Sequence, residues 1–144
     1  MTVAAMLKHK GHEVVSVEPS ATVAEIASLL SARHIGAVVV HTSSDLLLGV
    51  VSERDIVHAL ANHGAGALQM TAGQIMTRAP QTATPQTTII EAMEMMTEKR
   101  FRHMPVLEDG LLVGIVSIGD VVKHRLQELE LEANVLRDAY MSAH

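Results

Sequence analysis

The chain has 144 residues, 48% of them hydrophobic, and a formal net charge of −5 at pH 7. This length fits one compact domain or two half-size units that share a core, and the acidic balance argues against a nucleic-acid backbone as partner because proteins that bind one usually carry a basic face. No apolar run approaches the ~20 residues of a membrane span, no signal peptide is recognisable, and the lack of cysteine rules out disulfides. We therefore expect a cytoplasmic protein with no membrane or nucleic-acid partner.

The first half of the chain predicts a strand, a helix, two strands and a second helix. Their ranges are 14–17 for the first strand, 22–34 for the first helix, 36–40 and 46–51 for the next two strands, 42–45 for the turn between them, and 52–62 for the second helix. The first helix begins at a capping box, in which the Thr22 hydroxyl serves a backbone amide and Glu25 reaches back. The two later strands are continuous apolar runs.

The second half of the chain repeats this order. Its ranges are 81–84, 88–100, 103–107 and 111–116, with a turn at 108–110 and a last helix from 117 onward. Residues 63–66 are expected to form a loose connector, and residues 71–76 a short helix that matches a segment at 3–7.

The strands around each turn are apolar on both faces, which is typical of a sheet covered by helices on one side and by a second sheet on the other. A unit of about 50 residues is too small for a stable core of its own. The sequence therefore predicts an α/β (α+β) fold of two β-α-β-β-α repeats, related by a pseudo-twofold axis, with their sheets packed together and a long C-terminal helix.

A seven-residue pattern lies at the end of the second apolar strand of each half. It reads Gly-apolar-apolar-Ser-x-x-Asp and runs from Gly49 to Asp55 and again, 65 positions later, from Gly114 to Asp120. The flanking residues that recur with it are Pro19 and Pro85, Thr22 and Thr88, and Glu25 and Glu91. A doubled unit with a hydroxyl and a carboxylate after an apolar strand predicts two related ligand sites.

Two explanations compete for this pattern. A Ser followed three residues later by an acid is a capping box, so Ser52 with Asp55, and Ser117 with Asp120, would only start helices. The glycines favour a ligand, since a Gly in a strand often marks close approach of a backbone or ligand, and Gly119 costs roughly 1 kcal/mol relative to Ala in a helix. A helix N-terminus attracts phosphate, and a carboxylate there accepts bonds from two ribose hydroxyls. We predict capping and binding together.

These residues make the chain resemble a tandem pair of cystathionine β-synthase (CBS) domains, the arrangement called a Bateman module. The resemblance rests on the doubled motif, the Thr-x-x-Glu helix starts and the strand with Met104, Pro105 and Val106, and it covers residues 14 to about 125. The pattern is similar to that of small bacterial proteins that consist of the pair alone. It implies an adenosine-containing regulatory ligand between the repeats, namely AMP, ADP, ATP, NAD or S-adenosylmethionine, with no cofactor required.

The resemblance also implies which residues bind. In such modules the motif Asp holds the ribose, the motif Ser contacts ribose or phosphate, and the second strand of the other repeat lines each site. Carried over, one site contains Ser52, Arg54, Asp55, Phe101, Arg102 and His103, and the other contains Ser117, Asp120, Ile35 and Gly36. Because Arg54, Arg102 and His103 suit a phosphate, we expect the first site to bind a phosphorylated ligand tightly and the second a weaker or less charged one. Arg102 as a solvated cation is the alternative.

Catalysis and metal binding find little support. Ser52 and Ser117 have no recognisable His and Asp partners and lie in no Gly-x-Ser-x-Gly elbow. The histidines lack a third ligand at metal spacing, and the glycines at 64 and 66 form no dinucleotide fingerprint. We expect no catalytic residue, no metal site and therefore no enzyme.

The last helix is longer than its counterpart in the first half. A heptad seam, with spacings of 4, 3, 4, 3 and 4, is formed by Val122, Leu126, Leu129, Ala133, Leu136 and Tyr140. Such a seam packs either on the helix's own domain or against a second copy of the chain, and Leu131 and Val135, off the seam, leave both open.

The sequence thus predicts a non-enzymatic regulatory module that binds an adenosine compound and signals energy or redox state to an unknown protein target, as a homodimer. The alternative is an interaction scaffold with empty sites. The expected boundaries are 1–62 for the lead-in and first repeat, 63–78 for a linker, 79–127 for the second repeat and 128–144 for the helix extension, all in one compact module.

Overall fold

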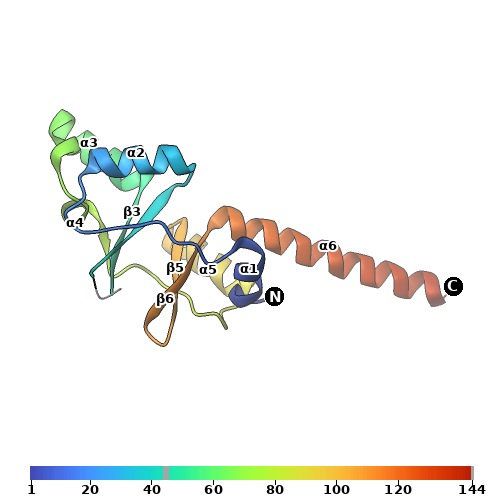
Figure 1. Ribbon diagram of the computed structural model, residues 1–144. Coiled ribbons are helices and arrows are strands. Elements are labelled where there is room, and N and C mark those ends of the chain that lie inside the picture. Colours follow the sequence, from blue (N-terminus) through green and yellow to red (C-terminus); the bar gives the residue numbers. More distant parts are fainter. Residues whose placement is uncertain (44–45, 144) are drawn as a thin grey trace.

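The computed structural model describes residues 1–43 and 46–143. Two lobes of mixed helix and sheet lie side by side, and a long C-terminal helix projects from one of them (Figure 1). The turn predicted at 42–45 includes residues 44 and 45, which lie outside the described residues.

The first lobe is a four-stranded sheet with helices on one face (Figure 1). Its strands are β1 (Ser16–Val17), β2 (Ala37–His41), β3 (Leu47–Ser52) and β4 (Thr77–Arg78), in that spatial order. β1 runs parallel to β2, and the other neighbours are antiparallel. The helices are α2 (Val23–Arg33) and α3 (Glu53–His63). α2 starts where the Thr22 hydroxyl accepts a bond from the Glu25 amide and ends at His34 in the left-handed conformation.

The sheet of this lobe is covered on both faces, as its apolar strands predict. Val38, Val40 and Val51 belong to the core beneath the helices. Val39 and Val50 alternate with them and therefore point to the opposite face, yet they are only 0% and 5% exposed.

The second lobe is the hairpin of β5 (His103–Glu108) and β6 (Leu111–Ser117), packed against α5 (Ile89–Lys99) and the start of α6 (Ile118–Ala143). The predicted strand at 81–84 is reduced to a single bridge between Ala83 and Val106. The next backbone donors that a parallel ladder would need on either side of this bridge belong to Pro85 and Pro105, which have no N–H, so the ladder cannot extend.

The two lead-in segments pack on the lobes in crossed fashion. Helix α1 (Val3–Lys10) lies on the second lobe, where the Val3 amide donates to the Thr87 carbonyl at 2.8 Å. Helix α4 (Ala72–Ile75) lies on the first lobe, where the Ala72 amide donates to the Ala21 carbonyl at 2.7 Å. The segment expected to be a linker is therefore ordered. The loose connector expected at 63–66 is wrong, because His63 ends α3 and residues 64–66 belong to the 3-10 helix η1 (Gly64–Gln69).

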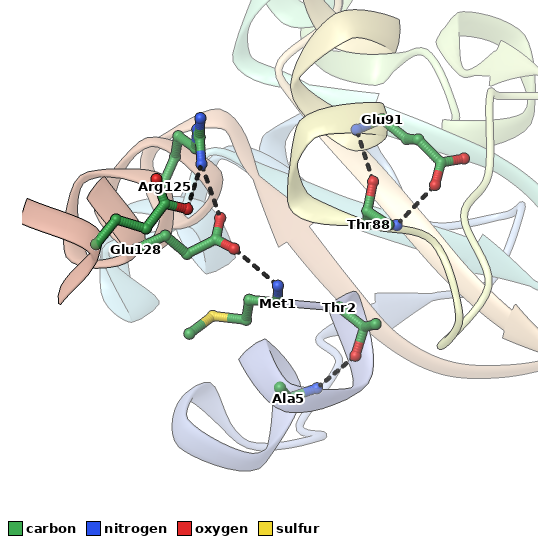
Figure 2. Close-up of polar contacts among 8 residues, drawn as sticks. Met1, Thr2, Ala5, Thr88, Glu91, Arg125 and Glu128 are labelled. Carbon is green, nitrogen blue, oxygen red and sulfur yellow. Dashed lines mark hydrogen bonds and ion pairs between the residues drawn. The ribbon is translucent and has the colours of Figure 1, made fainter. Parts of the chain in front are cut away.

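Helix α6 is anchored only at its start. Val121 and His124 are buried, and the Met1 amino group binds the Glu128 carboxylate at 2.7 Å, beside Arg125 (Figure 2). Along the seam, Leu126, Leu129 and Leu136 are 61%, 44% and 71% exposed. The interpretation in which the seam packs on its own domain is therefore wrong. No helix in the described part of the chain has the length and hydropathy needed to cross a membrane.

Candidate functional site

A pocket of about 530 Å³ opens where the two lobes meet. Most of its lining comes from three parts of the chain: the end of β3 with the start of α3, β4 with the residues that follow it, and the connection from α5 to β5. The lining residues are Gly36, Val50, Ser52, Glu53, Arg54, Asp55, Thr77, Ala79, Pro80, Gln81, Lys99, Arg100, Phe101, Arg102 and His103. This volume lies in the range of small-molecule sites, which are commonly found where domains meet.

Asp55 stands in this pocket at the N-terminus of α3. Its Oδ2 accepts hydrogen bonds from the Ser52 amide (2.8 Å) and the Ser52 hydroxyl (3.1 Å), so the predicted capping box is present. Its Oδ1 accepts a bond from the Thr77 hydroxyl (3.2 Å). Two carboxylate oxygens offer about four lone-pair sites, so the capping contacts leave room for a further donor.

Gly49 allows Thr77 to approach Asp55. A Cβ on Gly49 would lie 2.5 Å from the Thr77 carbonyl oxygen and 2.9 Å from the Met76 sulfur. In the second lobe, a Cβ on Gly114 would lie 2.8 Å from the Leu7 side chain. Gly49 and Gly114 therefore mark the close approach of the lead-in segments, and the use of these two glycines as a sign of a ligand is wrong.

Replacing Gly49 by Ala is expected to lower the free energy of unfolding by about 1–3 kcal/mol, because the clash is with backbone that cannot move without breaking the β3–β4 pairing. Chemical denaturation measures this change. Gly119→Ala is the matched control, since its Cβ would meet nothing nearer than the Ser117 hydroxyl at 3.6 Å, and Ala is the better helix former. Equal losses in both variants would contradict the role given to Gly49.

Four permanent cations line the pocket, out of 11 lysines and arginines in the chain. They are Arg54, Lys99, Arg100 and Arg102. Only Glu53 and Asp55 oppose them in the lining, and in residues 1–43 and 46–143 none of the four has a carboxylate within ion-pair distance. Arg100 ends α5 in the left-handed conformation (φ 57°). A pocket with excess positive charge in an acidic protein suits a phosphate.

His103 lies between the two motifs. Burial lowers its pKa below the usual value, more than the neighbouring Glu53 carboxylate raises it. The ring is therefore neutral at pH 7. A Cβ on Gly36 would lie 2.9 Å from the His103 Nε2 atom and 3.0 Å from the Glu53 Oε1 atom. The bare backbone of Gly36 thus makes room for both side chains in the pocket.

The carboxylate of the second motif, Asp120, is bonded by a lysine of the same chain. Lys10 donates from Nζ to Asp120 Oδ2 at 2.5 Å and to the Ile115 carbonyl at 2.8 Å. Ser117 caps α6, with its hydroxyl 2.9 Å from the same carboxylate. Burial would raise the pKa of Asp120, but the bonds from Lys10 and Ser117 outweigh it and hold that pKa below its usual value.

The structure thus separates the residues expected at the two sites. One pocket brings together Ser52, Arg54, Asp55, Phe101, Arg102 and His103, as expected for the first site. Gly36, expected beside Asp120, lines this same pocket, and Ile35 lines a hollow between α2 and α3 with Leu30 and Ile56. The reason is that Ile35 packs against the core of its own lobe.

Sequence reasoning missed several residues that complete these sites: Lys10, Glu53, Thr77, Lys99 and Arg100. Thr77 and Lys10 occupy corresponding places, each following or ending a lead-in helix and each bonded to a motif carboxylate. The similarity between segments 3–7 and 71–76 was the sequence feature that could have pointed to Lys10 and Thr77, but no binding role was assigned to either segment.

Comparison with protein families decides what this arrangement is. The family model described as "CBS domain" matches the chain twice, at residues 7–62 and 72–127. The chain belongs to the CBS-domain family. Its two copies stand in tandem, as the repeated motif predicts, and each matched range spans one helix–sheet unit of the fold.

Solved CBS structures share this architecture. The CBS-domain containing protein ATU1752 from Agrobacterium tumefaciens is 45% identical, with a TM-score of 0.85 over 87% of this chain and 99% of that one. CBSX2, solved in complex with AMP, is 29% identical, with a TM-score of 0.72 over 88% of this chain and 96% of that one.

A curated relative is the mitochondrial CBS domain-containing protein CBSX3 of Arabidopsis thaliana, 35% identical over 111 residues. The match covers 74% of this chain and 54% of that protein. The chain therefore spans about half the length of this relative.

Proposed function

We propose that this CBS pair is a non-enzymatic regulatory module that binds one adenosine phosphate in the Asp55 pocket. The observation that carries the proposal is the convergence of four cations and one helix-capping carboxylate on a single cavity. The AMP complex of CBSX2 supports the ligand class. ATP, ADP and NAD share the same adenosine phosphate and belong to the same proposal.

The proposed ligand is held at two ends. Asp55 accepts hydrogen bonds from the ribose hydroxyls, and Ser52, at the N-terminus of α3, faces the phosphate, which the partial positive charge of the helix end also stabilises. Arg54 and Arg102 pair with the phosphate oxygens, and the Phe101 ring provides apolar surface for the base. The presence of all five side chains in the lining of one pocket supports these proposed roles.

Binding would act on the relation between the lobes. Arg54 belongs to the first lobe and Arg102 to the second, so a phosphate that contacts both favours the arrangement in which they converge. A ligand shifts an equilibrium only by its difference in affinity for the two states. In the proposed role, a protein target reads that shift in the cytoplasm.

The Asp120 motif is proposed to bind no ligand in the native chain, because the Lys10 ammonium occupies the carboxylate. Replacing Lys10 by Met keeps the apolar stem and removes the charge, so the variant is expected to bind two ligands per chain instead of one. Titration calorimetry measures this number. Lys8→Met, an exposed position on the same helix, is the control and should keep one. A single site in the Lys10 variant would contradict the blocking role.

Thermal melting of the nucleotide-free protein tests the proposed function. A ligand at 100 times its dissociation constant adds about 2.7 kcal/mol, which raises the midpoint by several degrees. AMP, ADP, ATP and NAD are compared with adenosine, which lacks the phosphate. A rise with the phosphorylated ligands and a smaller one with adenosine supports the proposal. No rise with any of them at millimolar concentration would favour the scaffold with empty sites.

A further inference from the structure

Helix α6 carries, along its length, an apolar stripe that the chain itself leaves exposed. Val122, Leu126, Leu129 and Leu136 are 42% to 71% exposed. In Figure 1 the first turns of α6 lie against the second lobe, and the part of the helix toward the C-terminus stands clear of both lobes. In proteins most of the stability of a helix comes from packing its apolar face against another surface. The exposed stripe of this 26-residue helix is therefore expected to be covered by a partner.

The stripe has the heptad spacing of a coiled coil. In the usual a-to-g lettering, Leu126, Ala133 and Tyr140 take position a, and Val122, Leu129 and Leu136 take position d. The flanking g positions are then Arg125, Glu132 and Ala139, and the flanking e positions are Lys123, Glu130 and Arg137. Residues at g and e decide which partner and which orientation a coiled coil accepts.

The charges at these positions select a parallel pair of identical helices. In a parallel, in-register dimer each g residue faces the e residue five positions later on the partner. Arg125 then faces Glu130, and Glu132 faces Arg137, so every charged g–e contact joins opposite signs. An antiparallel pair built on the same a and d residues places Lys123 of one helix opposite Arg137 of the other. It also places Glu130 opposite Glu130, and Glu132 opposite Glu132. Like charges destabilise such contacts.

The ion pairs within one chain leave the charged e and g residues able to pair with a second chain. Arg137 has no carboxylate within ion-pair distance in the part of the chain that the structure describes. Arg125 lies 3.6 Å from Glu128 and 4.0 Å from Glu132 within its own helix, so the Glu132–Arg137 contact is the more informative one. We propose that the seam of α6 pairs with that of a second copy of this chain as a parallel, in-register coiled coil.

A matched pair of leucines tests the surface. Leu129 lies on the seam and Leu131 lies off it, and both are exposed, at 44% and 66%. Sedimentation equilibrium of the full chain, from about 1 µM to about 1 mM, is expected to show a monomer–dimer equilibrium. Leu129→Asp should weaken the dimer by at least about 100-fold, and Leu131→Asp should leave it within about threefold. Circular dichroism and the melting midpoint confirm that both variants fold.

Charge reversal tests the orientation. Arg137→Glu places like charges across the g–e contact and should weaken the dimer several-fold. The double variant Glu132→Arg/Arg137→Glu restores opposite signs and should restore the dimer. The chain holds no cysteine, so Ala143→Cys, at the next d position, gives a further readout. Mild oxidation should link two parallel helices there into a covalent dimer.

Each result decides the proposal. A monomer at all concentrations overturns it. A dimer that resists Leu129→Asp, or that forms no cross-link at 143, places the contact elsewhere on the molecule and also overturns it. Because none of these positions lines the pocket, ligand binding by the variants reports separately on the proposed function.

Discussion

Asp55→Asn is expected to weaken AMP binding by about 100-fold and leave the fold intact. A hydrogen bond to a charged group contributes about 1.5–3 kcal/mol, and the ribose is proposed to make two with this carboxylate. Asn keeps an oxygen that can accept the bond from the Ser52 amide, so the loss of unfolding free energy should stay below about 1 kcal/mol. Calorimetry and thermal melting of the same sample measure the two effects.

Asp120→Asn is the matched control for this prediction. It changes the same motif position in the other repeat, where Lys10 holds the carboxylate, and it should leave AMP affinity at the native value. A large fall in the melting midpoint of Asp55→Asn, with AMP binding unchanged, would mean that the motif serves only as a cap.

Leu7→Ala is expected to lower the free energy of unfolding by about 2–5 kcal/mol. Leu7 is 1% exposed and belongs to the core of the second lobe, although its helix α1 precedes the strands and helices of the first lobe in the chain. Its side chain fills the space above Gly114. Truncating a buried Leu removes apolar contacts and leaves a cavity that the surroundings fill only in part. Urea denaturation measures the loss.

Leu111→Ala provides the comparison, because this leucine of the β5–β6 hairpin is 57% exposed. Its loss should remain near 0.5 kcal/mol, as for most surface positions. Similar losses in the two variants would contradict the packing of α1 on the second lobe.

Much of the fold follows from local pattern. The Thr22 and Thr88 helix starts, the apolar strands and the doubled motif each specify an element from a few neighbouring residues. The repeat then implies two similar units, and the family match shows that they are CBS domains.

The crossed packing of α1 and α4 could not be predicted from those patterns. It depends on contacts between residues far apart in the chain, such as the Val3 amide with the Thr87 carbonyl. The same holds for Lys10 at Asp120 and Thr77 at Asp55. From the sequence alone, a lysine near the N-terminus is expected to be a solvated cation, because nothing local shows that it contacts a carboxylate in the second lobe.

The positive charge of the pocket was recognised only in part. Arg54 lies within the first motif, and Arg102 was expected only because the family resemblance places the second strand of the other repeat at this site. By their positions in the sequence, Lys99 and Arg100 are the basic residues that commonly end a helix, which the helix dipole favours. Their place in the pocket follows from the turn at Arg100, where the chain leaves α5 and enters β5.

Titration calorimetry of the nucleotide-free native protein with AMP tests the central claim most directly. The account predicts saturable binding at one AMP per chain, with an affinity that falls as salt is added because the phosphate is held by exposed cations. Two equivalent sites per chain, or no binding at millimolar AMP, would contradict it.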